Sequence, residues 1–171
     1  MELRKANITD VPRLEKVIIE SFLVPHGHAA PKEFIDDYIA RNFNAKKIEK
    51  EILDLSNQFY VIEYKNQIAG FSKVMFNFKN ENISDVNVTK MERIYLLKEY
   101  YGLGLGQKLF DFNVQLAKQN HQKGMWLHVW TENKRAINFY QKMGMKSVGN
   151  YDFPVSKEHT NPNHVIDRKS T

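Results

Sequence analysis

The stretch 91–130 constrains the fold of this chain more than any other part of the sequence. Residues 91–97 have strand character, residues 102–106 form a glycine-dense turn, and apolar spacing predicts a helix over 106–119. Another strand is predicted over 125–130. Two strands joined by a crossover helix run parallel, because the helix returns the chain to the end of the sheet where the first strand began.

The remaining segments predict further strands and helices around this unit. Period-two patterns indicate a hairpin of strands at 59–64 and 68–78. We expect a short first strand at 3–6 and a last strand at 165–167, with Tyr151-Asp152-Phe153 and a polar loop up to His164 before it. Helical spacing and caps predict helices from Thr9 or Asp10 to about Phe22, over 32–43, after Asn44, and over 133–143. We therefore expect a mixed α/β (α+β) fold: a mostly antiparallel central sheet with one parallel pair, flanked by helices.

Size and composition are those of one globular domain spanning 1–171. The apolar share of 42% is too high for a disordered chain, and no apolar run approaches the ~20 residues that span a bilayer. No secretory signal is recognised at Met1–Lys5, so we expect a cytoplasmic protein without a membrane partner. The chain has no cysteine, which excludes disulfides, thiolate catalysis and cysteine metal sites.

The net charge of +5 and the pI of about 9.2 suit a polyanionic partner. Nucleic acid and the phosphates of a cofactor both fit that description. The Lys and Arg residues are scattered rather than gathered on one predicted helix, which makes nucleic acid the weaker interpretation.

The glycine turn lies where a strand feeds a helix. Free backbone N–H groups and the helix dipole can hold a phosphate there, and glycine lets the backbone approach it closely. The alternative to a phosphate-binding turn is a tight turn that needs glycines for steric reasons alone. Two nucleotide motifs fail: Gln107 stands where a dinucleotide fingerprint needs its third glycine, and Gln107-Lys108-Leu109 where a P-loop needs Gly-Lys-Ser/Thr.

Tyr101-Gly102-Leu103-Gly104-Leu105-Gly106 does resemble motif A of the GNAT acetyltransferases, Gln/Arg-x-x-Gly-x-Gly/Ala, with Tyr101 at the Gln/Arg position. In that family the motif holds the pyrophosphate of coenzyme A at a helix start. The resemblance implies acetyl-CoA as co-substrate, bound by the backbone N–H groups of Gly102, Leu103, Gly104, Leu105, Gly106 and Gln107.

The segment from Asn133 to Met145 resembles the second GNAT signature, Asn-x-x-Ala-x-x-Phe-Tyr-x-x-x-Gly-Phe, at every position except Met145. The resemblance implies that Tyr140 is the general acid that protonates the leaving thiolate, and that Asn133 hydrogen-bonds the pantetheine arm. An unplaced helical tyrosine is otherwise a core residue. Gly144 is expected to end the helix in a left-handed conformation.

The strand at 92–96 is implied, by the same resemblance, to splay from its parallel neighbour. Main-chain groups of Ile94 and Leu96 would then bind the pantetheine, and the Leu96 N–H would stabilise the oxyanion. An alkylammonium must lose a proton before it attacks, and we assign Glu92 as the base; an ordinary strand carboxylate is the open alternative. His26 and His28 lack further ligands for a metal, so no metal is expected, and His128 is interpreted as packed.

Residues 32–78 are similar to the bacterial PaiA-type polyamine acetyltransferases, which implies spermidine or spermine as acceptor. Carboxylates that could line a groove for such a polycation are Glu33, Asp36, Asp37 and Glu92. Residues 33–37 could equally be the solvated face of a helix. The alternatives left open are another small amine or a protein amine as acceptor, and a non-catalytic acyl-CoA-binding regulator. The sequence leaves the oligomeric state open, including a homodimer.

Overall fold

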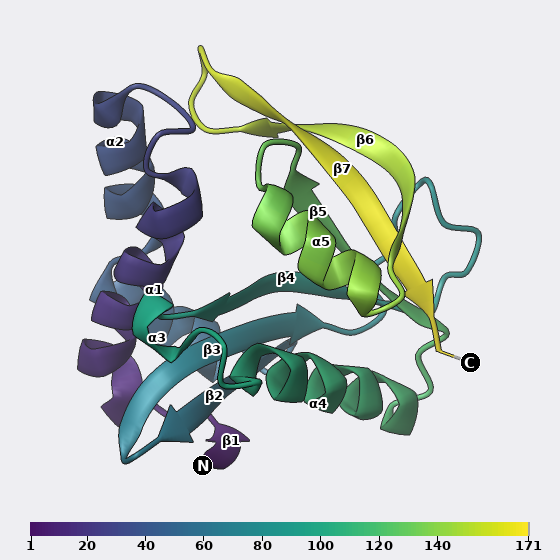
Figure 1. The fold of residues 1–171 in the computed structure, drawn as a ribbon, viewed down its shortest axis with the longest axis horizontal. Coiled ribbons are helices and arrows are strands. Elements are labelled where there is room, and N and C mark those ends of the chain that lie inside the picture. Colours follow the sequence, from purple (N-terminus) through teal and green to yellow (C-terminus); the bar gives the residue numbers. More distant parts are fainter. Residues whose placement is uncertain (171) are drawn as a thin grey trace. The chain divides into compact units, whose positions relative to one another are not determined.

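The computed structural model describes residues 1–170. Its elements in chain order are β1 (Glu2–Lys5), a 3-10 turn (Ile8–Asp10), α1 (Val11–His26), α2 (Lys32–Asn42), α3 (Ala45–Leu53), β2 (Asn57–Tyr64), β3 (Gln67–Met75), β4 (Val88–Leu96), a second 3-10 turn (Lys98–Tyr100), α4 (Leu105–Gln119), β5 (Gly124–Trp130), α5 (Lys134–Lys142), β6 (Lys146–Pro154) and β7 (Thr160–Lys169) (Figure 1).

The strands form a seven-stranded sheet in the order β1-β2-β3-β4-β5-β7-β6. The pairs β1–β2, β5–β7 and β7–β6 are antiparallel, and β4–β5 is parallel. The parallel ladder is short: it joins Val88–Lys90 to Gly124–Trp126, while both strands continue beyond it. The predicted mixed sheet with one splayed parallel pair is confirmed.

The chain divides into two compact units. The first contains Met1–Lys73 and Arg93–Phe110, and the second contains Val74–Glu92 and the chain from Asp111 onward. Strands β3 and β4 and helix α4 therefore each contribute residues to both units. The two units are described separately below.

The core of the first unit is formed by apolar side chains of α1, α3, β2 and β3. Leu14, Ile18, Ile48, Phe59 and Phe71 are almost completely buried in it. Their helical or alternating spacing explains why these segments form amphipathic elements.

The boundaries of the first helices differ slightly from the predicted ones. Asn44 caps α3 as predicted, because its side-chain oxygen accepts from the Lys47 N–H at 3.0 Å. Helix α1, however, continues past the predicted end to His26, with Pro25 in its last turn. Asp10 is the N-cap residue of α1, one of the two predicted positions, although its side chain makes no capping hydrogen bond to that helix. Asn7 caps the preceding 3-10 turn through a capping box with Asp10.

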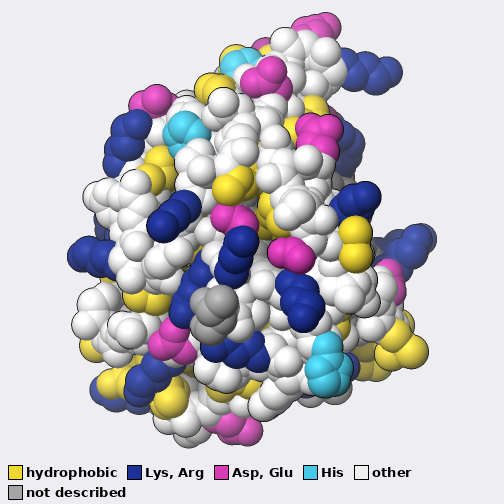
Figure 2. All heavy atoms as spheres, turned by 90° about the vertical axis from the view of Figure 1, so that its right-hand side faces the viewer, with side chains coloured by type: hydrophobic (Ala, Val, Ile, Leu, Met, Phe, Trp, Pro, Cys, Tyr) yellow, Lys and Arg dark blue, Asp and Glu magenta, His cyan; other side chains and the backbone are white. Residues whose placement is uncertain are grey.

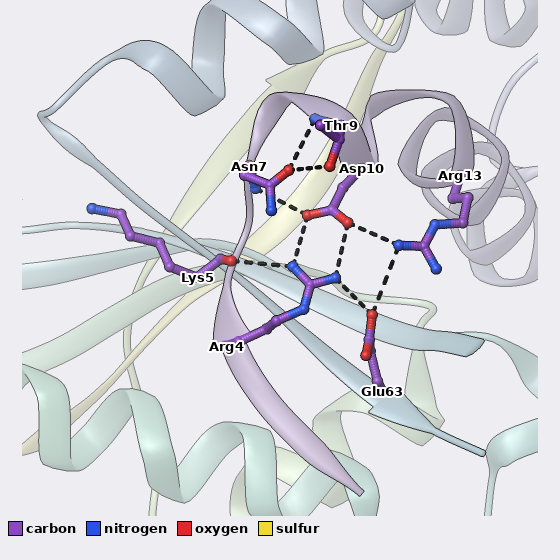
Figure 3. A network of polar contacts seen from close by, with 7 residues as sticks. All are labelled: Arg4, Lys5, Asn7, Thr9, Asp10, Arg13 and Glu63. Atoms are coloured by element: carbon purple, nitrogen blue, oxygen red, sulfur yellow. Dashed lines mark hydrogen bonds and ion pairs between the residues drawn. The ribbon is translucent and has the colours of Figure 1, made fainter. Parts of the chain in front are cut away.

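A network of ionised side chains ties β1 to the start of α1 and to β2 (Figure 3). Arg4 binds Asp10 with two nitrogens, at 2.8 and 2.9 Å, and donates to Glu63 at 2.6 Å. Arg13 adds a contact of 3.0 Å to Asp10, whose side chain is only 1% exposed. Hydrogen bonding from Arg4 lowers the pKa of Asp10. The buried carboxylate is thus compensated by two guanidinium groups.

Replacing Asp10 by Asn should lower the free energy of unfolding at pH 7 by about 2–3 kcal/mol, because Arg4 then loses a buried, bidentate ionic partner. The lowered pKa means that this stabilisation is present above the unfolded-state value of about 3.9 and is lost as the pH falls through the folded-state pKa. Urea unfolding should therefore show a difference in the free energy of unfolding between the unaltered chain and Asp10→Asn that is smaller at pH 3 than at pH 7.

The matched control is Asp37→Asn, which removes an exposed partner of Arg41. It should change stability by less than about 0.5 kcal/mol. A deficit for Asp10→Asn that stays constant with pH would contradict the ionic assignment.

The second unit is built on β5, which pairs along its whole length with β7. Strand β6 pairs with β7 as a long hairpin with a register irregularity between Ser147 and Gly149. The prediction of a polar loop up to His164 was wrong, since β7 begins at Thr160. Asn161 and Asn163 lie in this strand and are mostly buried. Their polar side chains suggested a loop, but pairing with β6 places this segment in the sheet.

None of the helices within residues 1–170 is long and apolar enough to cross a membrane.

Candidate active site

The glycine turn adopts the backbone conformation that its sequence suggests. Gly102 and Gly104 have φ values of +79° and +72°, a region that L-residues with a Cβ avoid. A Cβ placed on either residue would meet no atom within 4 Å among the described residues. The glycines are therefore required by backbone conformation rather than by crowding inside the protein, and the space above them is open.

Helix α4 begins directly after this turn. The Lys108 N–H donates to the Gly104 carbonyl at 3.1 Å, which is the first helical hydrogen bond. Within the described part of the chain, the N–H groups of Leu105, Gly106 and Gln107 have no acceptor. Three adjacent donors at the positive end of a helix dipole are an arrangement that can hold an anion such as a phosphate.

The end of β4 lies in the same unit, and its side chains alternate between two faces. Ile94 and Leu96 pack in one apolar cluster with Leu105 and Leu109 of α4. Tyr95 packs in the other cluster, with rings of α1 and α2. The structure thus brings Ile94 and Leu96 together with the start of the helix that follows the glycine turn.

The main-chain groups of β4 also alternate. The Leu97 N–H donates to the Ala69 carbonyl of β3 at 2.9 Å, and a Cβ on Gly70 would collide with the Tyr95 carbonyl oxygen. Tyr95 and Leu97 therefore direct main-chain groups toward β3. Because neighbouring residues of a strand point their main-chain groups to opposite sides, those of Ile94 and Leu96 point away from β3.

In the second unit, helix α5 holds Tyr140 and Asn133. The Asn133 side-chain oxygen accepts from the Ala136 N–H at 3.3 Å and so caps the helix. Tyr140 is 8% exposed. The helix ends as predicted, with Gly144 at φ +82°. Bonds from the Gly144 N–H to the Gln141 carbonyl and from the Met145 N–H to the Tyr140 carbonyl complete a Schellman motif.

Glu92 also belongs to the second unit and is an exposed residue of β4. The other predicted carboxylates lie on α2 in the first unit, where Asp36 pairs with Lys32 and Asp37 with Arg41, and both carboxylates are more than half exposed. These i,i+4 pairs are typical of a solvated helix face. The structure therefore favours the solvated-face interpretation for residues 33–37.

Residues 12–145 match the acetyltransferase (GNAT) family. The chain belongs to the GNAT acetyltransferase family. It is an acetyltransferase, and acetyl-CoA is its co-substrate.

Relatives of this GNAT protein carry similar descriptions. An uncharacterized N-acetyltransferase from Lactobacillus delbrueckii subsp. lactis is 29% identical over 87% of this chain and 86% of its own length. A spermine/spermidine N(1)-acetyltransferase from Bacillus subtilis is 29% identical over 55% of this chain and 62% of its own length. Among solved structures, the PaiA N-acetyltransferase from Thermoplasma acidophilum, determined in complex with coenzyme A, has a TM-score of 0.79 at 23% identity and covers 98% of both chains.

Two arrangements in the first unit of this acetyltransferase were not found from the sequence. The Glu51 carboxylate pairs with Arg93 and, at 3.5 Å, with Lys73, and all three side chains are at least 85% buried. His26 Nε2 lies 3.2 Å from the Tyr95 hydroxyl. Both join residues far apart in the chain, so no local pattern could have revealed them.

His128 is a packed residue of the second unit, as predicted. It stacks on Tyr151 with ring centroids 4.2 Å apart and meets the edge of Trp126 at 5.2 Å. Burial, and to a smaller extent Lys90, lower its pKa to about 4. His128 is therefore neutral at pH 7. A group with so low a pKa is a weak base and would accept a proton from an ammonium poorly.

A cavity of about 480 Å³ lies in the second unit between α5 and the β6–β7 hairpin, with Ile137, Gln141 and His164 in its wall. Tyr140 and Asn133 do not line it. Within residues 1–170, no group of three or more His, Asp or Glu side chains could hold a metal ion.

Figure 2 shows one face of the molecule, where Lys and Arg side chains lie interspersed with Asp and Glu.

Proposed function

We propose that this GNAT protein transfers the acetyl group of acetyl-CoA directly to a primary amine, and that the glycine turn binds the phosphates of the co-substrate. The observation that carries the proposal is the set of N–H groups of Leu105, Gly106 and Gln107, which have no acceptor within residues 1–170, next to two glycines with open space above them. The N–H groups of Gly102, Leu103 and Gly104 complete the proposed cradle. Acetyl-CoA carries anionic phosphates, which suit donors at a helix start.

The pantetheine arm would bind along β4, where the main-chain groups of Ile94 and Leu96 point away from β3. The Leu96 N–H would donate to the carbonyl oxygen of the thioester and stabilise the negative charge that develops on it. Asn133 contributes a second contact: its oxygen caps α5, which leaves the amide Nδ2 as the group that donates to the pantetheine.

Glu92 would accept a proton from the acceptor ammonium, directly or through a water molecule, to give the nucleophilic amine. As the carbon–nitrogen bond forms and the carbon–sulfur bond breaks, Tyr140 would donate its hydroxyl proton to the departing sulfur. The second proton that the nitrogen loses on becoming an amide would pass through solvent and restore the Tyr140 hydroxyl. The products are then an N-acetylated amine and coenzyme A.

For the acceptor we propose a polyamine, with spermidine as the first choice. The support comes from the spermine/spermidine N(1)-acetyltransferase of Bacillus subtilis, a relative of this chain, and from the resemblance of residues 32–78 to PaiA-type polyamine acetyltransferases. The carboxylates of α2 add little support, because Asp36 and Asp37 already pair with cations on the same helix.

Spermidine should be acetylated with a higher kcat/KM than an amino acid, an aminoglycoside or a lysine peptide, because a polyamine matches the named activity of that relative. The measurement is release of coenzyme A in the presence of each amine, with the acetylated product identified by mass spectrometry. A clear preference for one of the other amines would reject the polyamine and keep the acetyltransferase. Coenzyme A release without any acetylated amine would reject direct transfer to these acceptors.

A further inference from the structure

The hydrogen-bonded pair formed by His26 and Tyr95 lies in the first unit and has no part in the proposed chemistry. His26 is the last residue of α1, and Tyr95 lies on β4 between Ile94 and Leu96. The Tyr95 side chain belongs to the cluster that contains rings of α1 and α2, whereas Ile94 and Leu96 pack against α4. The pair is therefore on the face of β4 opposite the start of α4.

Aromatic contacts fix the two rings in place. His26 stacks on Phe22 with centroids 4.9 Å apart, and Phe22 stacks on Tyr38 at 5.5 Å. Phe71 holds Tyr95 from another side at 5.9 Å. The imidazole meets the edge of the Tyr95 ring, with Nε2 3.2 Å from the hydroxyl oxygen. The direction of the hydroxyl is thus determined by His26.

The electrostatics around this pair favour an uncharged ligand. Burial lowers the pKa of His26 to about 4 and raises the pKa of Tyr95, so both groups are neutral at pH 7. The dominant effect on the Tyr95 hydroxyl is burial, which raises its pKa more than the nearby Arg93 lowers it. Burial disfavours an ammonium at this position and favours the free amine.

We propose that Tyr95 binds the nitrogen of the acceptor amine and that His26 is its positioning residue. The inference rests on the proposed acetyl transfer. His26 Nε2 accepts the hydroxyl proton of Tyr95, which leaves the lone pairs of the phenol oxygen to accept an N–H of the uncharged amine. The acceptor amine would thus bind on the face of β4 that carries Tyr95. The phosphates of the co-substrate would bind at the start of α4, which packs on the opposite face of β4.

The test compares Tyr95→Phe, His26→Phe and the double variant, with spermidine as acceptor and also with the amine that ranks first in the screen if the two differ. Tyr95→Phe and His26→Phe should each raise the amine KM about fivefold, the effect of losing one neutral hydrogen bond. Acetyl-CoA affinity, measured by calorimetry, should stay within about twofold of the unaltered chain. The double variant should be no worse than Tyr95→Phe alone, because His26 acts through Tyr95.

The control is Tyr64→Phe, which removes a phenol oxygen from the other cluster of the same unit and should leave the amine KM unchanged. An unchanged amine KM in Tyr95→Phe overturns the proposal, as does a double variant in which the two effects add. Should His26→Phe fail to fold, the comparison of Tyr95→Phe with Tyr64→Phe decides alone. If the unaltered chain acetylates no amine, the proposed function fails and this inference fails with it, an outcome visible before any variant is made.

Discussion

Replacing Tyr140 by Phe should lower the turnover number by about 10² to 10⁴, the range expected for the loss of a positioned general acid. This corresponds to about 2.7–5.5 kcal/mol of transition-state stabilisation. The hydroxyl is needed only as the thiolate leaves, so acetyl-CoA affinity should change little. Single-turnover kinetics and calorimetry would measure the two quantities separately.

The phenyl ring of the Tyr140→Phe variant still fills a position that is 8% exposed, which keeps the packing of α5 intact. Tyr151→Phe, which removes the exposed hydroxyl of another tyrosine in the same unit, is the matched control and should keep full turnover. Retained turnover in Tyr140→Phe, with chemistry shown to be rate-limiting, would make Tyr140 a structural residue. An equal loss in acetyl-CoA affinity would make it a binding residue instead.

Replacing Gly104 by Val should weaken acetyl-CoA binding by about 100-fold or more. The φ of +72° forces a β-branched residue into a strained backbone conformation, and the new side chain occupies the open space in front of the helix start. Loss of charge-assisted hydrogen bonds from the N–H groups accounts for an effect of this size. Isothermal titration with acetyl-CoA is the measurement.

Gly144→Val provides a matched control for the Gly104→Val variant. Gly144 has a similar φ of +82°, and a Cβ there meets only the Arg168 side chain, at 3.7 Å or more. Both variants carry comparable backbone strain, so urea unfolding should show similar losses of stability. Equal acetyl-CoA affinity in the two variants would mean that the glycine turn does not bind the co-substrate.

Much of the fold could be predicted because its signals are local. The crossover from strand through helix to strand appears in apolar spacing, and the parallel pairing of β4 and β5 follows from chain connectivity. The turn between β2 and β3 is equally local, since Lys65 and Asn66 both have positive φ. Strand β7 was missed over Thr160–His164, because its polar residues are ordered by pairing with β6.

The sequence by itself determined the family of this protein and which helix ends need a glycine in a left-handed conformation. Both could be predicted because each of the two short motifs lies at a helix end, where the backbone conformation depends on neighbouring residues. Only the tertiary structure decided which charged residues from distant parts of the chain meet. It joined Arg4 to Asp10 and Glu63, and it placed Glu51 beside Lys73 and Arg93. It also brought His26 to Tyr95, 69 residues later in the chain. The physical reason is that burial and ionic pairing depend on distances across the fold, which a pattern of neighbouring residues does not contain.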